Sequence, residues 1–173
     1  MGNDFRDLAQ EYAGKVFTYA RYALRDHQDA EDVTQEVLIR LWKNHDSIEP
    51  SRLSAWVMRV TRNLVIDCSR RHRTRAAVFV DGPAAETSAA SVAAAPTPDA
   101  HAGRAELREV IERAIAELDE PQRSIVVMRE IQGLAYEEIA DALNMPLGTV
   151  KVYLHRARRR MRERVRAQLG EHV

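Results

Sequence analysis

The chain has 173 residues with a formal net charge of zero, and 45% of the residues are hydrophobic. That length suits one domain or two small ones, and the single cysteine, Cys68, excludes an internal disulfide. No apolar run in the sequence reaches the length of a membrane span, and the first residues lack the apolar core of a signal peptide. We therefore expect a cytoplasmic protein that does not insert into membranes.

Apolar residues recur at helical spacing through the first part of the chain. The spacing predicts helices over residues 5–24 and about 29–44, with Asp29 as the N-cap of the second. A loop marked by Pro50 leads to a third long helix, which Ser51 or Ser54 could cap. The predicted buried stripes are Ala30, Val33, Val37, Leu41 and Trp42 in the second helix and Trp56, Val57, Val60, Leu64 and Cys68 in the third.

Residues 76–103 differ in composition from both flanking parts. They are rich in Ala, contain Pro83, Pro96 and Pro98, and have no Lys or Arg. Such a segment buries too little apolar surface to offset the entropy of ordering it, so we predict a flexible linker. The linker divides an N-terminal domain, residues 1–75, from a C-terminal domain, residues 104–173.

Helical spacing resumes at residue 104, and Asp119 is expected to cap a helix that ends at Gly133. Two amphipathic runs then flank a turn, with Asn144 suited to a left-handed conformation and Pro146 opening the second run. In that run Val150, Leu154, Ala157 and Met161 form the expected buried stripe, and the other faces are basic. The pattern predicts a helix-turn-helix whose second helix enters the major groove, although an ordinary helical hairpin with a solvated charged face has the same spacing.

The zero net charge results from segments of opposite sign. Residues 151–166 contain eight Lys or Arg and one acid, whereas residues 104–150 contain ten acids and five basic residues. The local basic patch is what matters for binding a polyanion. The side chains near the start of the last helix are expected to reach base edges, and later arginines such as Arg158, Arg159, Arg160 and Arg162 are expected to reach phosphates.

Catalysis is not expected, because the sequence has no Gly-rich phosphate loop, no paired histidines at metal-ligand spacing and no acid pair that suggests acid–base chemistry. Cys68 is interpreted as a small core residue. We expect no cofactor and no metal site. In the N-terminal domain, Arg59, Arg62, Asn63 and the basic residues from Arg70 onward lie near Trp56 and could track a nucleic-acid backbone, or they could form a solvated face at the end of a helix.

Three stretches resemble a bacterial RNA polymerase sigma factor of the extracytoplasmic-function (ECF) group. DAEDVTQEVLIRLWKN (29–44) resembles regions 2.1–2.2, and SRLSAWVMRVTRNLVIDCSRRHR (51–73) resembles regions 2.3–2.4. LDEPQRSIVVMREIQGLAYEEIADALNMPLGTVKVYLHRARRRM (118–161) resembles region 4. The resemblance implies an all-α protein in which a region 2 domain and a region 4 domain, with its helix-turn-helix, are joined by the linker.

The same resemblance implies a role for each domain. The N-terminal domain would bind core RNA polymerase and the melted −10 element of promoter DNA, where Asn63 and the loop at residues 46–54 would hold a flipped base. The linker would follow the RNA exit path, and an anti-sigma factor could hold the protein inactive. The family often has Ser-Arg where this chain has Val152-Tyr153, so Val152 is expected to meet a thymine methyl. The implied sets are Asp32, Gln35, Glu36 and Ile39 for the polymerase, Trp56, Arg59, Arg62, Asn63 and Arg70 for the −10 element, and Thr149, Lys151, Val152, His155, Arg156 and Arg159 for the duplex −35 element.

Two other classes of protein remain open on the sequence. One is a stand-alone helix-turn-helix regulator of duplex DNA, with the first half as a dimerisation or sensing domain. The other is an adaptor whose helices bind a protein partner. The acidic helix around Gln35 and Glu36 favours a sigma factor over the stand-alone regulator, because a repressor does not need it.

Overall fold

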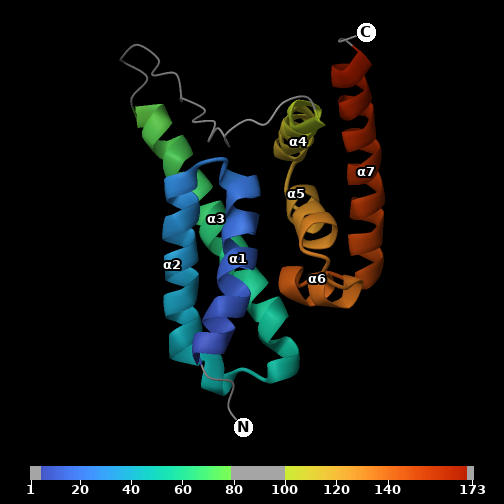
Figure 1. Ribbon diagram of the computed structural model, residues 1–173. Helices are drawn as coiled ribbons and strands as arrows, with labels where there is room; N and C mark the ends of the chain where they lie inside the picture. The colour runs from blue at the N-terminus through green and yellow to red at the C-terminus, as the bar shows by residue number, and fades with distance from the viewer. Residues whose placement is uncertain (1–4, 79–99, 171–173) are drawn as a thin grey trace. The chain divides into compact units, whose positions relative to one another are not determined.

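The computed structural model describes residues 5–78 and 100–170, and the regular elements in those two ranges are all helical (Figure 1). The chain divides into two compact units. The N-terminal unit contains α1 to α3, and the C-terminal unit contains α4, α5, most of α6, and α7. The prediction of an all-α protein with two small helical domains is therefore confirmed.

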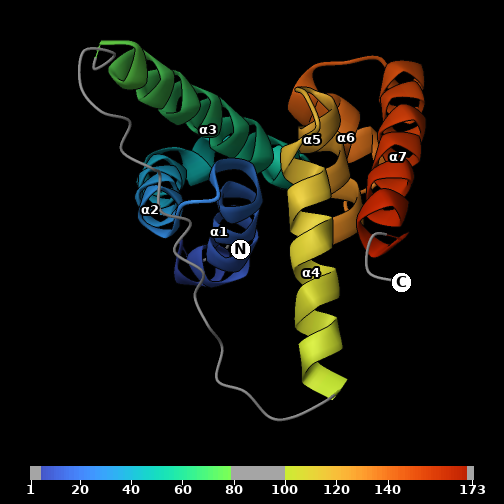
Figure 2. The ribbon, with the colours of Figure 1, turned by 90° about the horizontal axis from the view of Figure 1, so that it is seen from above.

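The N-terminal unit is a bundle of three helices. These are α1 (Phe5–Leu24), α2 (His27–Asn44) and α3 (Leu53–Val78), and each contacts the other two. In Figure 2, α1 and α2 are seen end-on, down their helix axes, and α3 lies against both. Two short 3-10 turns, His45–Ser47 and Pro50–Arg52, connect α2 to α3. The core of the unit is aliphatic and aromatic, with Val16, Tyr19, Val37, Leu41 and Val57 all nearly inaccessible to solvent.

Three details of the N-terminal unit differ from the prediction. Asp26, not Asp29, caps α2, since its carboxylate accepts the Asp29 N–H at 2.9 Å. Trp42 is 59% exposed although it adjoins the buried Leu41, because one step along α2 turns its side chain about 100° away from Leu41 and off the buried stripe. The serines predicted as caps of α3 do not begin it, because Ser51 lies in the preceding turn and Ser54 lies inside the helix.

The buried face of α3 is also rotated from the predicted stripe. Val57 and Cys68 are buried as expected, but Val60 and Leu64 are partly exposed, and Met58, Thr61 and Val65 are buried instead. The predicted apolar stripe did not include Thr61, because its side chain is polar. Its hydroxyl donates to the Val57 carbonyl at 2.8 Å, which satisfies the polar group within the helix.

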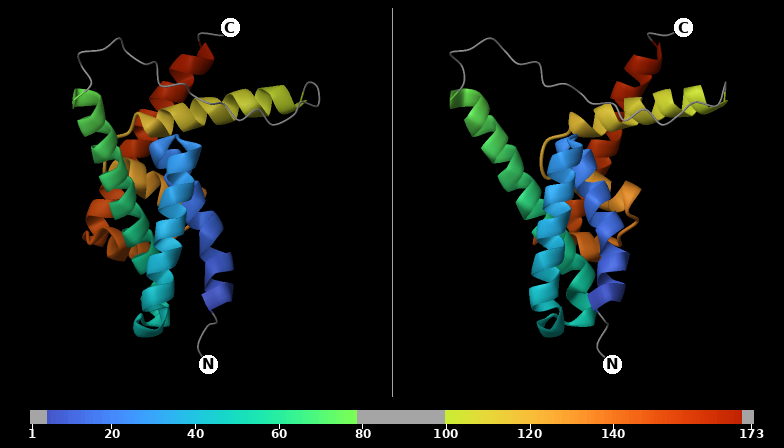
Figure 3. Two further views of the ribbon diagram at one scale, coloured as in Figure 1. Left: turned by 90° about the vertical axis from the view of Figure 1, so that its left-hand side faces the viewer. Right: turned by 60° about the vertical axis from the view of Figure 1, so that its left-hand side comes forward.

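The C-terminal unit is built around its last helix. Its elements are α4 (Ala100–Ala116), α5 (Gln122–Val126), a π-helical turn (Val127–Ile131), α6 (Tyr136–Leu143) and α7 (Leu147–Gly170). Both α4 and α5 contact α7, and both views of Figure 3 show α4 crossing α7. Together they enclose a core that includes Ile115, Leu118, Ile125, Met128 and Leu154.

Turn chemistry positions the helix-turn-helix. Gly133 has a φ of 72° after the π-helical turn, and Asn144 has a φ of 51° between α6 and α7. Both residue types tolerate this left-handed conformation, so the two sequence predictions are confirmed. The Glu138 carboxylate accepts the Ala135 N–H at 2.7 Å, which satisfies one free donor at the start of α6. Asp119 was predicted to cap α5, but the N-cap of α5 is Pro121. The Asp119 carboxylate instead forms an ion pair with Arg160.

Helical structure extends into both ends of the predicted linker. α3 continues to Val78 and α4 begins at Ala100, so residues 76–78 and 100–103 are helical. Residues 79–99 lie outside the described residues. Over residues 5–78 and 100–170, no helix combines the length and apolarity needed to cross a bilayer.

Candidate nucleic-acid interface

The recognition helix α7 has two opposite faces. Val150, Leu154 and Ala157 are at most 1% exposed and attach α7 to the rest of the C-terminal unit. Their spacing of three and four residues keeps them on one side of the helix, with the partly buried Met161 a turn further on. The predicted stripe is therefore confirmed, and it fixes which side of α7 faces outward.

The outward side carries the residues predicted to contact the −35 element. Lys151, Val152, His155, Arg156 and Arg159 are exposed, and Thr149 is partly exposed in the first turn. Val152 is 49% exposed, which is unusual for a large aliphatic side chain in a helix that has a buried stripe available. We call this set the α7 face: Thr149, Lys151, Val152, His155, Arg156 and Arg159.

Tyr136 supports the first charged residue of the α7 face. The Lys151 ammonium lies 5.7 Å from the centre of the Tyr136 ring, and the Arg129 guanidinium carbon lies 4.6 Å from it. Both distances fall within the range of cation–π attraction, which is about 6 Å. Arg129 is held in addition by a hydrogen bond of 2.6 Å to the Leu134 carbonyl. The ring therefore contacts two cations, one from the π-helical turn and one from the first turns of α7.

From Arg158 onward, several arginines of α7 are used differently. Arg158 donates through Nε and Nη2 to one Glu130 oxygen at 3.0 and 2.6 Å, and this hydrogen bonding raises the pKa of the guanidinium. Arg160 pairs with Asp119 at 3.2 Å, and Arg164 pairs with Glu117 at 2.8 Å. These pairs join α7 to the segments that precede the helix-turn-helix. Arg158 and Arg160 thus have an intramolecular role that the sequence prediction of phosphate contacts did not include.

The residues predicted for the −10 element lie along α3. Trp56, Arg59, Asn63 and Arg70 follow at intervals of three, four and seven residues, which places them on one side of the helix, with Arg62 at its edge. Arg59, Asn63 and Arg70 are exposed, and Trp56 and Arg62 are partly buried. We call this set the α3 face: Trp56, Arg59, Arg62, Asn63 and Arg70. An aromatic ring among cations and an amide suits unstacked bases and their phosphates.

The residues predicted for the polymerase lie along α2. Asp32, Gln35 and Ile39 are exposed, and Glu36 is partly exposed with its carboxylate 2.8 Å from Arg40. Ile39 is 47% exposed, as the sequence indicated. We call this set the α2 surface: Asp32, Gln35, Glu36 and Ile39.

Two aromatic residues, Trp42 beside the α2 surface and Tyr136 beside the α7 face, were not identified as site residues from the sequence. Trp42 stands three residues after Ile39 and extends the α2 surface with a large exposed ring. The sequence does contain a signal for Trp42, because the helical spacing of residues 32, 35, 39 and 42 places it on the same face of α2. Tyr136 had no such signal, because its position beneath Lys151 depends on the turn between α6 and α7.

Comparison with known proteins identifies the class. Residues 8–75 match the family model for sigma-70 region 2, and residues 108–161 match the model for sigma-70, region 4. The chain is 32% identical over 168 residues to the ECF RNA polymerase sigma factor SigW of Bacillus subtilis (strain 168), covering 94% of this chain and 89% of SigW. It is 34% identical to the ECF sigma factor SigL of Mycobacterium tuberculosis (strain H37Rv), covering 91% of this chain and 86% of SigL.

A solved structure shares the fold. The sigma factor RpoE from Bartonella quintana, in complex with the anti-sigma factor NepR, matches with a TM-score of 0.70 and 27% identity. The match covers 93% of this chain and 98% of RpoE. A two-domain helical protein with a region 2 bundle and a region 4 helix-turn-helix is a sigma-70-type factor, a subunit that directs RNA polymerase to promoters. This chain belongs to the ECF group of that family.

Proposed function

We propose that this sigma factor divides promoter recognition among its three surfaces. The α2 surface binds core RNA polymerase, the α3 face binds the melted −10 element, and the α7 face reads the duplex −35 element. The observation that supports this best is the geometry of α7, whose buried stripe directs Lys151, Val152, His155 and Arg156 outward together.

The α7 face has the chemistry needed to read base edges. Lys151 and Arg156 are donors of the kind that bind guanine O6 and N7, and each good contact provides about 1–3 kcal/mol of discrimination. Val152 brings an exposed methyl pair to the position where a thymine methyl would be met. The side chain of Val152 cannot donate a hydrogen bond, so this position would favour thymine through apolar contact.

The α3 face suits DNA whose bases are already unpaired. Asn63 can hydrogen-bond a base edge, Trp56 offers a ring for stacking, and the arginines can follow the phosphates. Reading an extruded base in this way costs the energy of unstacking, which is lower once the strand is melted. We propose that the loop at residues 46–54 forms one wall of the site for that base.

The α2 surface combines carboxylates, an amide and an exposed aliphatic side chain. An exposed apolar residue rimmed by polar groups is typical of a protein-binding surface. The exposed Trp42 enlarges the apolar part, and aromatic residues are enriched where binding energy concentrates. We include Trp42 with Asp32, Gln35, Glu36 and Ile39 in the proposed contact with core polymerase.

Residues 76–103 complete the proposal as the tether between the two DNA-reading domains. A linker lets the polymerase set the spacing between the −10 and −35 sites, and binding at one site raises the effective concentration at the other. Because RpoE, which is similar to this chain, was solved with an anti-sigma factor, we also infer that an anti-sigma partner holds this protein inactive.

The polymerase contact is tested by replacing Gln35 and Glu36 together with Ala. We expect the double variant to lose co-purification with core polymerase while its helical content and unfolding remain those of the wild type. The chain offers a matched control in Gln10 and Glu11, which are adjacent, exposed and on α1. Glu11 pairs with Lys15 at 3.0 Å just as Glu36 pairs with Arg40, so the control removes the same chemistry. Retained binding by the Gln35→Ala/Glu36→Ala variant would refute the assignment.

Promoter recognition is tested by run-off transcription with core polymerase over a promoter library. We expect transcripts that depend on two sequence elements at −10 and −35, read in one experiment. Transcription that is insensitive to the −35 sequence would contradict the role given to the α7 face. Duplex binding without core polymerase at equal affinity would favour a stand-alone regulator instead.

A further inference from the structure

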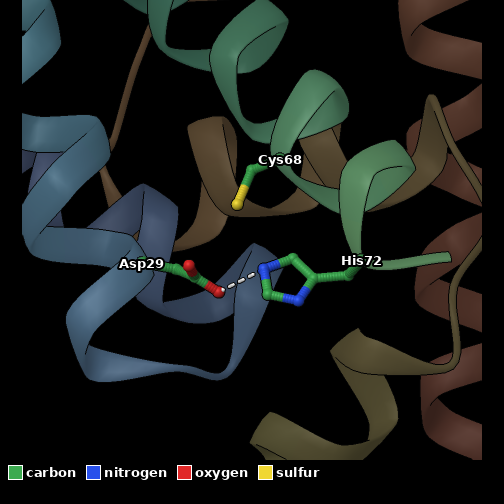
Figure 4. A group of neighbouring side chains, drawn as sticks. All are labelled: Asp29, Cys68 and His72. Atoms are coloured by element: carbon green, nitrogen blue, oxygen red, sulfur yellow. Dashed lines mark ion pairs between the residues drawn. The ribbon is translucent and has the colours of Figure 1, made fainter. Parts of the chain in front are cut away.

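Three side chains with metal-binding atoms meet in the N-terminal unit, where α2 begins and α3 approaches its end (Figure 4). Asp29 comes from the first turn of α2, and Cys68 and His72 come from α3. One ligand atom from each of the three lies within 4.8 Å of the other two. The sequence predicts no metal site here, because Asp29 is distant from Cys68 along the chain and no sequence spacing connects the two.

The fold holds these three groups in place. Cys68 and His72 are four residues apart, so they extend from the same face of α3. Asp29 is fixed by its backbone, whose N–H donates to the N-cap Asp26 at 2.9 Å. His72 Nε2 then lies 2.8 Å from Asp29 Oδ2, as the dashed line in Figure 4 shows. Both α2 and α3 are long helices, so the ligands stand on rigid elements rather than on loops.

We propose that Asp29, Cys68 and His72 bind a zinc ion that bridges α2 and α3. A thiolate, an imidazole and a carboxylate are the three ligand types that Zn²⁺ accepts, and a fourth position would remain for water or a partner's side chain. Ca²⁺ and Mg²⁺ prefer sites made of oxygen ligands, so a site with sulfur and nitrogen does not suit them.

The separations are close to those of a zinc site. Zinc–ligand bonds of about 2.0–2.3 Å in a tetrahedron separate the ligand atoms by roughly 3.3–3.8 Å. The Asp29–His72 pair, now 2.8 Å apart, would open by less than about 1 Å, and the Cys68 sulfur, which lies within 4.8 Å of both, would approach by at most about 1.5 Å.

The surroundings define how the ion would enter. Cys68 is buried, Asp29 is partly buried and His72 is exposed, so the ion would arrive from the side of the imidazole. Burial raises the pKa of the Cys68 thiol, the charge of Asp29 adds to that effect, and Arg71 opposes it. Zinc binding would displace the thiol proton and replace the repulsion between thiolate and carboxylate with attraction to one cation.

The expected consequence is a stabilised N-terminal unit. The ligands come from two helices, so the complete set exists only in the folded chain, and an ion that binds only the folded state stabilises it. The site would attach the last part of α3 to the start of α2. This part of α3 carries the exposed residues Arg70 and Arg71. This inference does not depend on the proposed contacts with polymerase or DNA.

Cobalt provides a direct probe of the site in the full-length chain. Metal-free protein titrated with Co²⁺ should develop a thiolate-to-cobalt charge-transfer band that saturates at one equivalent, and Zn²⁺ should abolish it by displacement. Absence of this band would overturn the proposal, because Cys68 is the single thiol in the chain.

Variants separate this site from adventitious binding to surface histidines. Cys68→Ser should abolish the band, and Asp29→Asn and His72→Gln should each weaken zinc binding at least about ten-fold, the low end of losses seen when even an outer-shell partner is removed. His72 is exposed, so His72→Gln should fold normally and should lose the rise in melting temperature that zinc gives the wild type.

The matched control for that variant is His27→Gln. His27 is also exposed, lies in the same unit and pairs with a carboxylate one helical turn away, Glu31, at 3.2 Å. We expect this control to leave zinc affinity unchanged. Equal losses in the His27 and His72 variants, or wild-type affinity in Cys68→Ser, would show surface binding only and refute the site.

Discussion

The parts of α7 before and after the buried Ala157 carry the same kind of side chain, and several of these side chains are used in opposite ways. We call these two parts, residues 147–157 and 158–170, the first and second half of α7. In the first half, Lys151, His155 and Arg156 project outward. Among the residues that the structure describes, no carboxylate forms an ion pair with any of the three. In the second half, Arg158 and Arg160 meet Glu130 and Asp119 from elsewhere in the unit. A basic run in a sequence is therefore not a direct map of a DNA contact surface.

The difference also shows where opposite charges of the C-terminal unit meet. The acidic segment before the helix-turn-helix and the basic helix after it cancel in composition, and the structure shows that part of this cancellation is physical contact. Glu117, Asp119 and Glu130 each hold one arginine of α7. Lys151 and Arg156 take no part in these three pairs, and they lie in the first turns of α7, where base contacts are expected.

The largest expected effect comes from removing the stripe on which both halves depend. Leu154 is 1% exposed, and Leu154→Ala should lower the free energy of unfolding of the C-terminal unit by about 2–5 kcal/mol through lost burial and a cavity. Urea unfolding measures this change. Val152→Ala is the matched control, because that side chain is 49% exposed and should change stability by less than about 0.5 kcal/mol. Similar losses in the two variants would mean that α7 does not face as described.

The next effect tests the first half alone. Lys151→Ala and Arg156→Ala should each cost about 1–3 kcal/mol in discrimination between the preferred −35 sequence and a mutated one. Equilibrium binding of the holoenzyme to the two DNA fragments measures it. Arg160→Ala removes the same charge from the second half and should leave that discrimination unchanged. If Arg160→Ala relaxed the sequence preference as much as Arg156→Ala, the division of α7 would be wrong.

Much of this arrangement could be predicted from the sequence because it depends on local rules. The stripe of α7, the left-handed turn at Asn144 and the end of a helix at Gly133 follow from spacing and backbone preference, and the structure confirms all three. Family resemblance added the division into regions 2 and 4, which the matches to known proteins confirm.

What could not be predicted depends on contacts between segments distant in the sequence. The partner of Arg158 lies 28 residues earlier and the partner of Arg160 lies 41 residues earlier, so no local pattern connects them. The ring of Tyr136 beneath Lys151 and the approach of Asp29 to Cys68 have the same origin. The rotated face of α3 has a different cause, since the buried Thr61 is satisfied by its own helix and an apolar pattern does not count it.

The smallest effect tests the second half through the Arg158–Glu130 pair. Both side chains are more than 40% exposed, so solvent screening should limit their coupling to about 0.2–1 kcal/mol of unfolding free energy. A double-mutant cycle with Arg158→Gln, Glu130→Gln and both together measures that coupling. The pair Arg159–Glu163 is the control, since it lies within α7 at 3.6 Å and should give a value at or below the low end of this range. If Arg158→Gln instead left stability unchanged and weakened holoenzyme binding to all DNA sequences alike, Arg158 would act as a phosphate contact, and both halves of α7 would serve the DNA.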